Sequence, residues 1–407
     1  MMPKTSLEGI RVAAFTHFAA GPIAAQYMGS LGADVIKVES PAQDVNRYAL
    51  RDPDGHLQGI SPYFVVTNRN QRNVCLNLKT EDGLAAAKAL IASSDVLIEN
   101  YRPGVMEKLG LGYEAVKKIN PRIIYASISA YDPEGSARDR PGQDLLIQAL
   151  SGIASLTGRG DGPPIPVGAY IIDGFTAMQV LVGILAALRH RDATGEGQAI
   201  RADMMSSSMF LMSQEASYIL NVNPDPIRSS AGIAHVNQSA PYGVYQVKDG
   251  AIVLSTFGGV PMVKNLVAAL KIDDLTEEDI TEQKIRFNRD EIASKIAARL
   301  APMTKAEAMA IIEPTGTWTA PVRTLAEALA DPAVVETGII QDVRTPYGGE
   351  YKIVAEPLRM EKTPLVSRRP AAALGEHTRE VLAELGLASG EAQSCAVGKL
   401  QPTPARL

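Results

Sequence analysis

Residues 11–39, RVAAFTHFAAGPIAAQYMGSLGADVIKVE, indicate the fold class of this chain. The apolar run 11–15 is typical of a strand, Gly21-Pro22 lies in the turn that opens a helix to about residue 31, and residues 34–39 read as a second strand. Short apolar strands that alternate with helices are typical of a parallel sheet covered on both faces. The stretch therefore predicts an α/β fold.

The same alternation continues through the first half of the chain. The pattern predicts helices over 81–93 and 105–118 and strands over 95–99 and 122–128. We therefore expect a Rossmann-like, doubly wound parallel sheet. Such sheets bind ligands beyond the carboxyl ends of their strands, at the point where the strand order reverses. The segments predicted to meet at that edge are 16–20, 39–47, 100–102 and 129–132.

The composition changes after about residue 200, which predicts a second domain. We expect a large α/β domain over 1–200, a linker over 201–225 and a small α+β domain over 226–325. Residues 326–407 are predicted to begin as a linker and then return to the large domain, which is therefore discontinuous. The composition from about residue 389 is typical of a disordered tail.

Charge and composition exclude several classes of protein. Lys plus Arg total 40 against 45 Asp plus Glu, a balance unlike that of a dedicated nucleic-acid binder. The five histidines and two cysteines show no metal-ligand spacing, and the most apolar run, 180–188, is shorter than the ~20 residues of a membrane span. No signal peptide, phosphate loop or dinucleotide fingerprint is present. We expect a cytoplasmic protein without metal, membrane or nucleic-acid partners.

Asp173 is the most informative acidic residue, in the stretch AYIIDGFTAMQV (169–180). One interpretation is a helix N-cap, because an Asp oxygen satisfies free amides of a first turn. The other is a nucleophile: the helix end would lower the pKa and keep the carboxylate ionised, and Gly174 would leave room for a reactant. Backbone amides at this helix start could also stabilise developing oxyanions.

Several segments, in order along nearly the whole chain, resemble one enzyme family. They are AAGPIAAQYMGSLGADVIKVE (19–39), NRNQRNVCLNLKTEDG (68–83), DVLIENYRPGVMEKLGLGYE (95–114), NPRIIYASISAYDPEG (120–135), RPGQDLLIQALSGIASLTGRGDGPPIPVG (140–168), RHRDATGEGQ (189–198) and GEHTREVLAELG (375–386). The chain resembles the class III coenzyme A (CoA) transferases, the CaiB/BaiF or formyl-CoA transferase-like family.

The resemblance implies that Asp173 is the catalytic nucleophile and that CoA or acyl-CoA is bound as a substrate, with no tightly bound cofactor. It implies CoA contacts at Ala19, Ala20, Leu76, Lys79, Asn100, Tyr101, Arg102, Lys108, Ser129, Ala130, Tyr131 and Asp132. Leu76, Lys79 and Lys108 lie outside the strand-end segments named above, and the others lie within them. Ala19 and Ser129 stand where the formyl-CoA enzymes carry glutamine and lysine. The resemblance therefore supports the CoA-transfer reaction for this chain more strongly than it supports oxalate and formate as substrates. Family members form interlocked homodimers.

The implied reaction is reversible CoA transfer between carboxylic acids through an aspartyl–acyl anhydride and an aspartyl–CoA thioester. Arg47, Arg51, Arg69 or Arg228 could pair with a second carboxylate of a dicarboxylate such as succinate. His17, Tyr242 and the methionines of 204–212 could line an acyl pocket, although core packing is the more ordinary role for the methionines.

Two alternatives stay open. One is a 2-methylacyl-CoA racemase, although Gln143 stands where that branch carries its proton-transferring histidine. The other is a non-catalytic CoA-binding protein.

Overall fold

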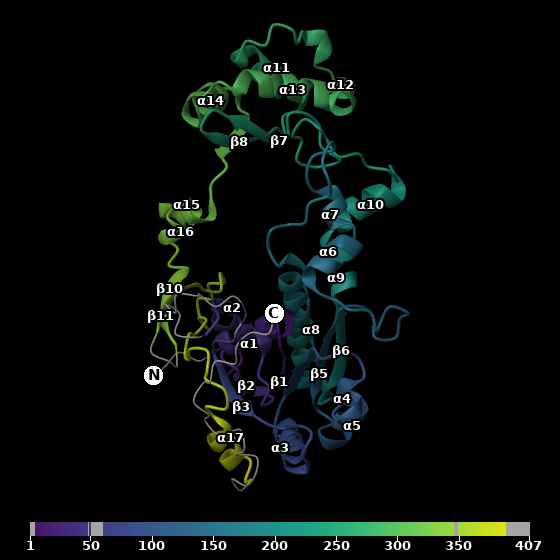
Figure 1. Cartoon of the computed structure of the whole chain (residues 1–407), viewed down its shortest axis with the longest axis vertical. Helices are drawn as coiled ribbons and strands as arrows, with labels where there is room; N and C mark the ends of the chain where they lie inside the picture. The colour runs from purple at the N-terminus through teal and green to yellow at the C-terminus, as the bar shows by residue number, and fades with distance from the viewer. Residues whose placement is uncertain (1–4, 48, 50–59, 346–348, 388–407) are drawn as a thin grey trace. The chain divides into compact units, whose positions relative to one another are not determined.

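The structure is a computed structural model that describes residues 5–47, 49, 60–345 and 349–387 (Figure 1). The predicted disordered tail from about residue 389 lies outside the described residues. The described chain forms two compact units. The first contains the residues up to Asp144, then Tyr170–Ser208 and the residues from Val335 onward; the second contains Leu145–Ala169 and Met209–Val334.

A six-stranded sheet forms the centre of the first unit. Its strands are β1 (Arg11–Phe15), β2 (Asp34–Glu39), β3 (Gln71–Cys75), β4 (Val96–Glu99), β5 (Ile124–Ser129) and β6 (Gln198–Asp203). All neighbouring strands are parallel, in the order β3-β2-β1-β4-β5-β6. The predicted parallel α/β sheet is therefore confirmed, and the strand order reverses between β1 and β4.

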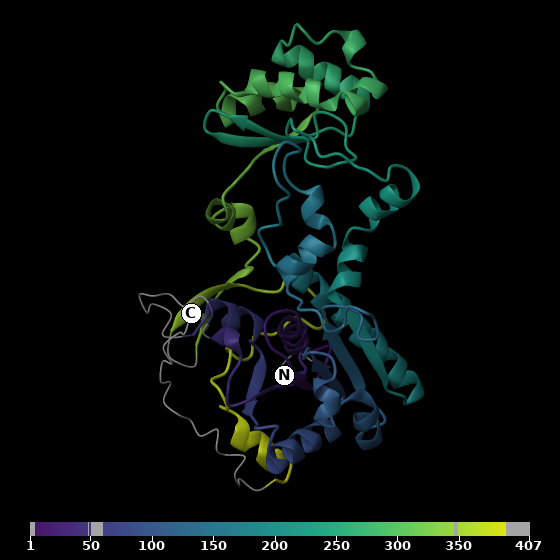
Figure 2. The ribbon, with the colours of Figure 1, turned by 45° about the vertical axis from the view of Figure 1, so that its right-hand side comes forward.

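Helices cover both faces of this sheet (Figures 1 and 2). Strand residues alternate between two apolar clusters: Val12 and Ala14 face one layer, and Ala13 and Phe15 face the other. The first layer contains α1 (Ala20–Ser30) and α8 (Ile171–Thr194). The second contains α3 (Glu81–Ala92), α4 (Val105–Lys108), α5 (Tyr113–Ile119) and α17 (Thr378–Glu384).

The predicted helix over 105–118 is wrong, because the chain forms two short helices there. After α4, Gly110 takes a φ of +67°, a conformation that glycine adopts without strain, and the chain turns before α5 begins at Tyr113. The sequence pattern carries apolar residues on both sides of this turn, so periodicity alone joined the two pieces.

Other elements complete the first unit. Two are complete in this unit: α2 (Pro62–Thr67) and the hairpin of β10 (Ile340–Arg344) and β11 (Glu350–Val354). Three further helices are divided between the units: this unit contains residues Met204–Ser208 of α9 (Met204–Leu211), the first residue of α6 (Asp144–Leu150) and the last residue of α16 (Pro332–Val335). The hairpin is antiparallel, and Tyr351 and Ile353 pack with Phe64 of α2 in a small core. The carboxyl-terminal part of the chain therefore does return to this unit.

The second unit contains a three-stranded antiparallel sheet in the order β7-β8-β9. The strands are β7 (Gly243–Val247), β8 (Gly250–Ser255) and β9 (Trp318–Pro321). Its helices are α7 (Ile153–Leu156), α10 (Ser213–Asn221), α11 (Gly259–Leu270), α12 (Glu282–Phe287), α13 (Arg289–Leu300), α14 (Lys305–Ile312) and α15 (Leu325–Leu329). One apolar core joins β7 and β8 to α11–α14.

These units have boundaries that differ from those predicted. Leu145–Ala169 belongs to the second unit, although the sequence places it in the 1–200 domain, and that unit extends to Val334 rather than to 325. The difference has a local cause: in this unit Gly160 N donates to Ser229 O at 2.8 Å, and Arg228 donates to the carbonyls of Thr157 and Gly162. The 158–162 loop is thereby fixed to residues far along the chain.

Within the described part of the chain, α8 is long and apolar enough to cross a membrane by length and composition. The core helix of a soluble protein passes the same test. Ala177, Val180 and Ile184 of α8 are fully buried in the layer with α1 and the sheet, although only 44% of the apolar stretch is buried within this chain. Its packing is that of a core helix.

Candidate active site

Asp173 is the third residue of α8 and is not its N-cap. Tyr170 occupies the N-cap position and makes no side-chain capping hydrogen bond. The cap comes instead from Asp144, the first residue of α6, whose Oδ2 accepts hydrogen bonds from the backbone N of Ile172 at 2.8 Å and of Asp173 at 3.0 Å. The N-cap interpretation of Asp173 is therefore wrong: a carboxylate 29 residues away performs that role.

This cap also uses the amides that were expected to stabilise oxyanions. The N–H groups of Ile172 and Asp173 point to Asp144, and Gly174 N donates to Tyr170 O at 3.2 Å. These three amides already have acceptors, so the predicted oxyanion role is not supported for them. Asp144 itself is 1% exposed and belongs to the RPGQD motif at 140–144, which was the sequence signal that could have identified it.

The charge state of Asp173 also differs from the prediction. Burial and the nearby Asp144 carboxylate raise the pKa of Asp173 to about 7, whereas the sequence predicts a lowered pKa. The predicted stabilisation by the helix end fails because Asp144 takes the amides and adds a second negative charge. Asp173 is thus a half-buried carboxylate that is ionised at pH values above about 7.

Gly174 leaves open space at the position that follows Asp173 in the chain. A Cβ atom built at Gly174 would meet no atom within 4 Å. By contrast, a Cβ at Gly183 of the same helix would lie 3.1 Å from Cγ2 of Ile200 on β6. Glycine at 174 is therefore not required by packing within this chain, and the space beside Asp173 is available to a reactant.

The point at which the strand order reverses is built around His17 and Asn100. Asn100 follows β4, and its side chain forms two hydrogen bonds with His17, accepting from the backbone N at 2.9 Å and donating to the backbone O at 2.8 Å. Nearby, Lys37 Nζ donates to Thr16 O at 2.9 Å. These three bonds fix the turn between β1 and α1, at the edge where open parallel sheets bind ligands.

Two polar atoms of this turn are buried and have no partner among the described residues. They are Oγ1 of Thr16 and Nδ1 of His17. The His17 ring lies between Phe18, at 4.9 Å between ring centroids, and Tyr101, at 5.2 Å. Burial lowers the pKa of His17 and so favours its neutral form. Buried polar atoms are rarely left unpaired, so a ligand or water is expected here.

The predicted CoA contacts all follow the carboxyl ends of neighbouring parallel strands. Ala19 and Ala20 follow β1, Leu76 and Lys79 follow β3, Asn100–Arg102 and Lys108 follow β4, and Ser129–Asp132 end or follow β5. The topology thus brings these segments to one edge of the sheet.

Their side chains differ in what they can offer a ligand. Lys79, Arg102 and Lys108 are exposed cations. Leu76 is 2% exposed and packs in the apolar core beneath α3, so its side chain is not available at the surface.

The segment after β5 is held mainly by its own hydrogen bonds. Ser129 Oγ donates to Tyr131 O at 2.6 Å, Tyr131 OH donates to Pro141 O at 3.3 Å, and Asp132 Oδ1 accepts from Glu134 N at 3.0 Å. Ala130 O accepts from Met205 N at 3.1 Å. This segment is therefore preorganised.

Two of the arginines considered for a second carboxylate already have other partners, and a third is only partly paired. Arg47 is buried and binds Glu39 through two nitrogens, with its guanidinium 3.9 Å from the centre of the Phe64 ring. Arg228 donates to backbone carbonyls. Arg69 is 1% exposed and pairs with Glu356 through Nη2, but its Nε and Nη1 are buried without a partner among the described residues. The dicarboxylate interpretation is therefore not supported at Arg47 and Arg228 and stays a prediction at Arg69, and Arg51 lies outside the described residues.

Buried charges beside the β1–α1 turn were not found by the sequence analysis. Lys37 pairs with Asp44 at 2.9 Å, and both side chains are 1% exposed. Arg47 and Lys37 hold the pKa of Glu39 at about 2. At the end of β4, burial raises the pKa of Glu99 to about 7, although Ser127 donates a hydrogen bond to it. In the sequence these residues look like ordinary strand and turn residues.

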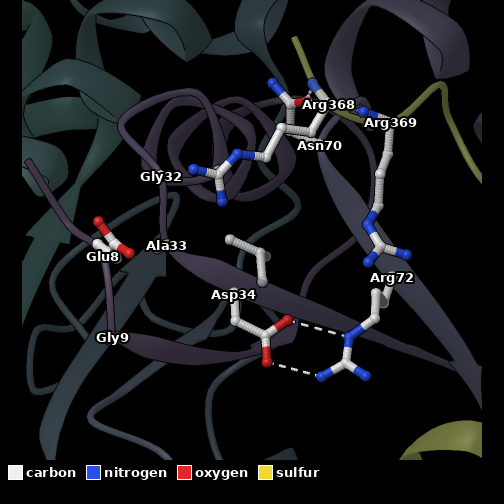
Figure 3. Close-up of a pocket in the computed structure, with 11 residues that line it drawn as sticks. Glu8, Gly9, Gly32, Ala33, Asp34, Asn70, Arg72, Arg368 and Arg369 are labelled. Atoms are coloured by element: carbon white, nitrogen blue, oxygen red, sulfur yellow. Dashed lines mark hydrogen bonds and ion pairs between the residues drawn. The ribbon is translucent and has the colours of Figure 1, made fainter. Parts of the chain in front are cut away.

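The described residues also line two pockets that do not contain Asp173. One, of about 200 Å³, lies at the opposite, amino-terminal edge of the sheet, next to the start of β2 (Figure 3). There Arg72 donates two hydrogen bonds to Asp34, and Arg368 and Arg369 reach the same pocket with Glu8 (Figure 3). The other, of about 650 Å³, is lined by residues of 337–367. Over the described ranges, no group of three His, Cys, Asp or Glu side chains is placed to hold a metal ion.

Comparisons with known proteins identify the family of this chain. The family model described as CoA-transferase family III matches residues 7–378. The chain is 34% identical over 394 residues to a succinate–glutarate CoA-transferase of Agrobacterium fabrum, covering 94% of this chain and 96% of that protein. It is 33% identical over 393 residues to a succinyl-CoA:mesaconate CoA-transferase of Haloarcula hispanica, covering 95% and 98%.

A solved structure has the same fold over most of its length. It is a CAIB/BAIF family protein from Brucella suis, which superimposes with a TM-score of 0.81 at 31% identity and covers 94% of this chain and 99% of that one. The match of the family model over most of the chain, together with relatives that are more than 30% identical at nearly full coverage, shows that this protein belongs to CoA-transferase family III.

Proposed function

We propose that this CoA-transferase moves CoA between an acyl-CoA donor and a free carboxylic acid through covalent intermediates on Asp173. The observation that carries the proposal is the environment of this carboxylate: it is half-buried beside the open space at Gly174, and the amides of its own helix turn are bonded elsewhere. A carboxylate with few stabilising hydrogen bonds is a stronger nucleophile than one held by a helix end.

The reaction would proceed in steps that conserve one high-energy acyl bond. An Asp173 oxygen attacks the donor thioester carbonyl, the carbon–sulfur bond breaks, and an aspartyl–acyl anhydride and CoA thiolate result. The thiolate then attacks the aspartyl carbonyl, which gives an aspartyl–CoA thioester and releases the donor acid. The acceptor carboxylate attacks this thioester, and the same steps in reverse yield the new acyl-CoA. One thioester replaces another, so no ATP is consumed.

The polyanionic CoA moiety would lie along the strand-end edge. Lys79, Arg102 and Lys108 are exposed there and supply positive charge for phosphate groups. The unpaired Thr16 Oγ1 and His17 Nδ1 lie in the turn at which the strand order reverses, where a ligand can supply their missing partners. The net charge of −5 does not oppose this binding, because the local groups determine the field at the site.

For the acids, we propose succinyl-CoA as a donor and a dicarboxylate as an acceptor. Both relatives described above carry succinate or succinyl-CoA in their names together with a second dicarboxylate, glutarate or mesaconate. Of the arginines considered for the second carboxylate, Arg47 and Arg228 already have partners. Arg69 keeps two buried nitrogens that are unpaired within the described part of the chain, and it stays a candidate.

A cytoplasmic homodimer is part of this proposal. The exposed side of α8 supports a partner chain: Val182 is 63% exposed and Leu185, one turn further, is 37% exposed. A helix with apolar side chains on its outer face is better explained by a protein partner than by exposure to water. The interlocked arrangement of the two chains follows from the family resemblance alone.

A direct exchange assay tests the proposed function. Succinyl-CoA is mixed with glutarate, mesaconate or other free acids, and new acyl-CoA species are followed by mass. We expect transfer to at least one dicarboxylate, and we expect Asp173→Asn to abolish it while CoA binding persists. Near-wild-type transfer by Asp173→Asn would refute the mechanism, and deuterium incorporation at the α-carbon without transfer would favour the racemase alternative.

A further inference from the structure

Asp144 stands out among the buried carboxylates because it is linked directly to Asp173. Its Oδ2 lies 2.8 Å from the Ile172 amide and 3.0 Å from the Asp173 amide, and its side chain is 1% exposed. Tyr170 offers α8 no side-chain cap, so the first turn of a 24-residue helix depends on this distant carboxylate. Asp144 and Asp173 therefore lie at the same helix end, and the first-turn amides donate their hydrogen bonds to Asp144.

We propose that Asp144 is a positioning residue that keeps Asp173 reactive, both by occupying the amides that would otherwise stabilise the nucleophile and by repelling its negative charge. This inference rests on the proposed function, in which Asp173 attacks a thioester. It assigns a specific role to a residue that does not itself touch the reacting atoms.

The repulsion acts on the state of Asp173 before reaction. When an Asp173 oxygen bonds to the acyl carbon and the carbon–sulfur bond breaks, the negative charge moves from the aspartate to the departing thiolate. The helix end then carries one carboxylate instead of two, so the repulsion from Asp144 is relieved in the acylated enzyme. An interaction that is unfavourable in the free enzyme and absent after attack accelerates the attack.

Other ionisable groups around Asp173 do not replace this effect. Tyr170, which precedes α8, interacts electrostatically with both Asp173 and Asp144, and Tyr63 of α2 faces Tyr170 with 5.7 Å between ring centroids. The hydrogen bond with Tyr63 raises the pKa of Tyr170, so Tyr170 is neutral near pH 7. Burial and Asp144 are the influences that raise the pKa of Asp173, and both disfavour its charged form.

The test compares pH profiles of kcat/KM for succinyl-CoA in the wild type, Asp144→Asn and a matched control, Asp249→Asn. Asp249 also accepts from the first turn of a helix from a distant segment: its Oδ1 accepts from Lys305 N at 2.7 Å at the start of α14, whose N-cap is Thr304. The acid limb of this profile reports the pKa of the essential carboxylate in the free enzyme, which is Asp173 in the proposed mechanism. For the wild type we expect a midpoint near pH 7, and we expect Asp249→Asn to keep it.

Asp144→Asn retains an acceptor oxygen for the amides but loses the charge. We expect its acid limb to move to lower pH by about one unit and its rate above pH 8 to fall roughly threefold to tenfold, so the two profiles cross. A uniform loss at every pH with an unchanged midpoint would overturn the proposal and leave Asp144 as a helix cap only. An unchanged profile would overturn it as well.

Two further measurements distinguish a failure of this proposal from a folding defect and from a failure of the proposed function. If Asp144→Asn does not fold, Asp144→Ser, a second neutral hydrogen-bond acceptor, is measured against the same expectations, and a wild-type acid-limb midpoint near pH 4 would overturn the proposal by itself. Transfer by the wild type and its loss in Asp173→Asn are measured first. If both of these results are obtained but the acid-limb midpoint of Asp144→Asn is unchanged, only the role of Asp144 is refuted. If the wild type shows no transfer, or if Asp173→Asn retains it, the proposed function is refuted.

Discussion

Substituting Gly174 by alanine separates stability from activity at the proposed nucleophile. The residue lies within α8, its φ is not in the left-handed region, and an added Cβ would meet no atom within 4 Å. Alanine stabilises a helix interior by about 0.5–1 kcal/mol relative to glycine. For a protein of this size that gain corresponds to a rise in Tm of about 1–2 °C. The chain alone therefore tolerates or favours alanine here.

The reaction would not tolerate it. The new methyl group would stand beside Asp173, in the space through which an acyl thioester must reach the carboxylate. Displacing a bound reactant by about 1 Å from its attack position costs roughly a hundredfold in rate. We therefore expect Gly174→Ala to lower kcat/KM for transfer about a hundredfold while Tm stays the same or rises.

Gly183→Ala in the same helix is the matched control. Its methyl group would come 3.1 Å from Ile200, so crowding offsets the gain in helix propensity and little or no rise in Tm is expected. Its transfer activity should remain that of the wild type. The assay is exchange between succinyl-CoA and a dicarboxylate, with thermal unfolding measured on the same samples. Wild-type turnover by Gly174→Ala would refute the claim that reactants approach Asp173 through this space.

Two more predictions concern stability. Because the pKa of Asp173 is raised to about 7 in the folded state, the folded protein binds more protons than the unfolded chain between about pH 4 and pH 7, and this residue makes stability fall as pH rises through that window. Asp173→Asn should remove this loss of stability. Its Tm should match that of the wild type near pH 4 and be higher at pH 8, because the variant gains about 1–3 kcal/mol of unfolding free energy there. Equal Tm values at pH 8 would contradict the raised pKa. Asn100→Ala should lower the free energy of unfolding by about 1–3 kcal/mol in urea titrations and raise KM for the CoA substrate, because both backbone groups of His17 lose their partner; an unchanged stability would show that the two hydrogen bonds contribute nothing.

The parallel sheet could be predicted where its strands carry apolar side chains. The runs 11–15 and 34–39 form β1 and β2 with the predicted bounds, and each is apolar because helices cover both faces. β3 was not predicted, since QRNVC reads as a polar segment although all five residues are buried. Its polar groups find partners far away in sequence: Arg72 pairs with Glu380 and Glu384, and Cys75 N donates to Thr378 Oγ1. Local patterns do not contain such partners.

The candidate site was predicted in part for the same reason. The strand-end segments could be located, because the carboxyl ends of parallel strands share an edge. The electrostatics of Asp173 could not, because they depend on the contact of Asp144 with a helix that begins 27 residues later. In the same way, Arg47 reads as a surface residue in the sequence. In the structure it forms a salt bridge with Glu39, and the ring of Phe64 packs against its guanidinium.

Isotope transfer to Asp173 tests the central claim most directly. In the proposed sequence of steps, an oxygen of the acceptor carboxylate bonds to the aspartyl carbonyl and stays on Asp173 when the new acyl-CoA forms. The enzyme is therefore allowed to turn over succinyl-CoA with an ¹⁸O-labelled acceptor acid, and the peptide that contains Asp173 is analysed by mass spectrometry. We predict that Asp173 acquires ¹⁸O during turnover and that no other residue does. Complete turnover with an unlabelled Asp173 would contradict the covalent mechanism.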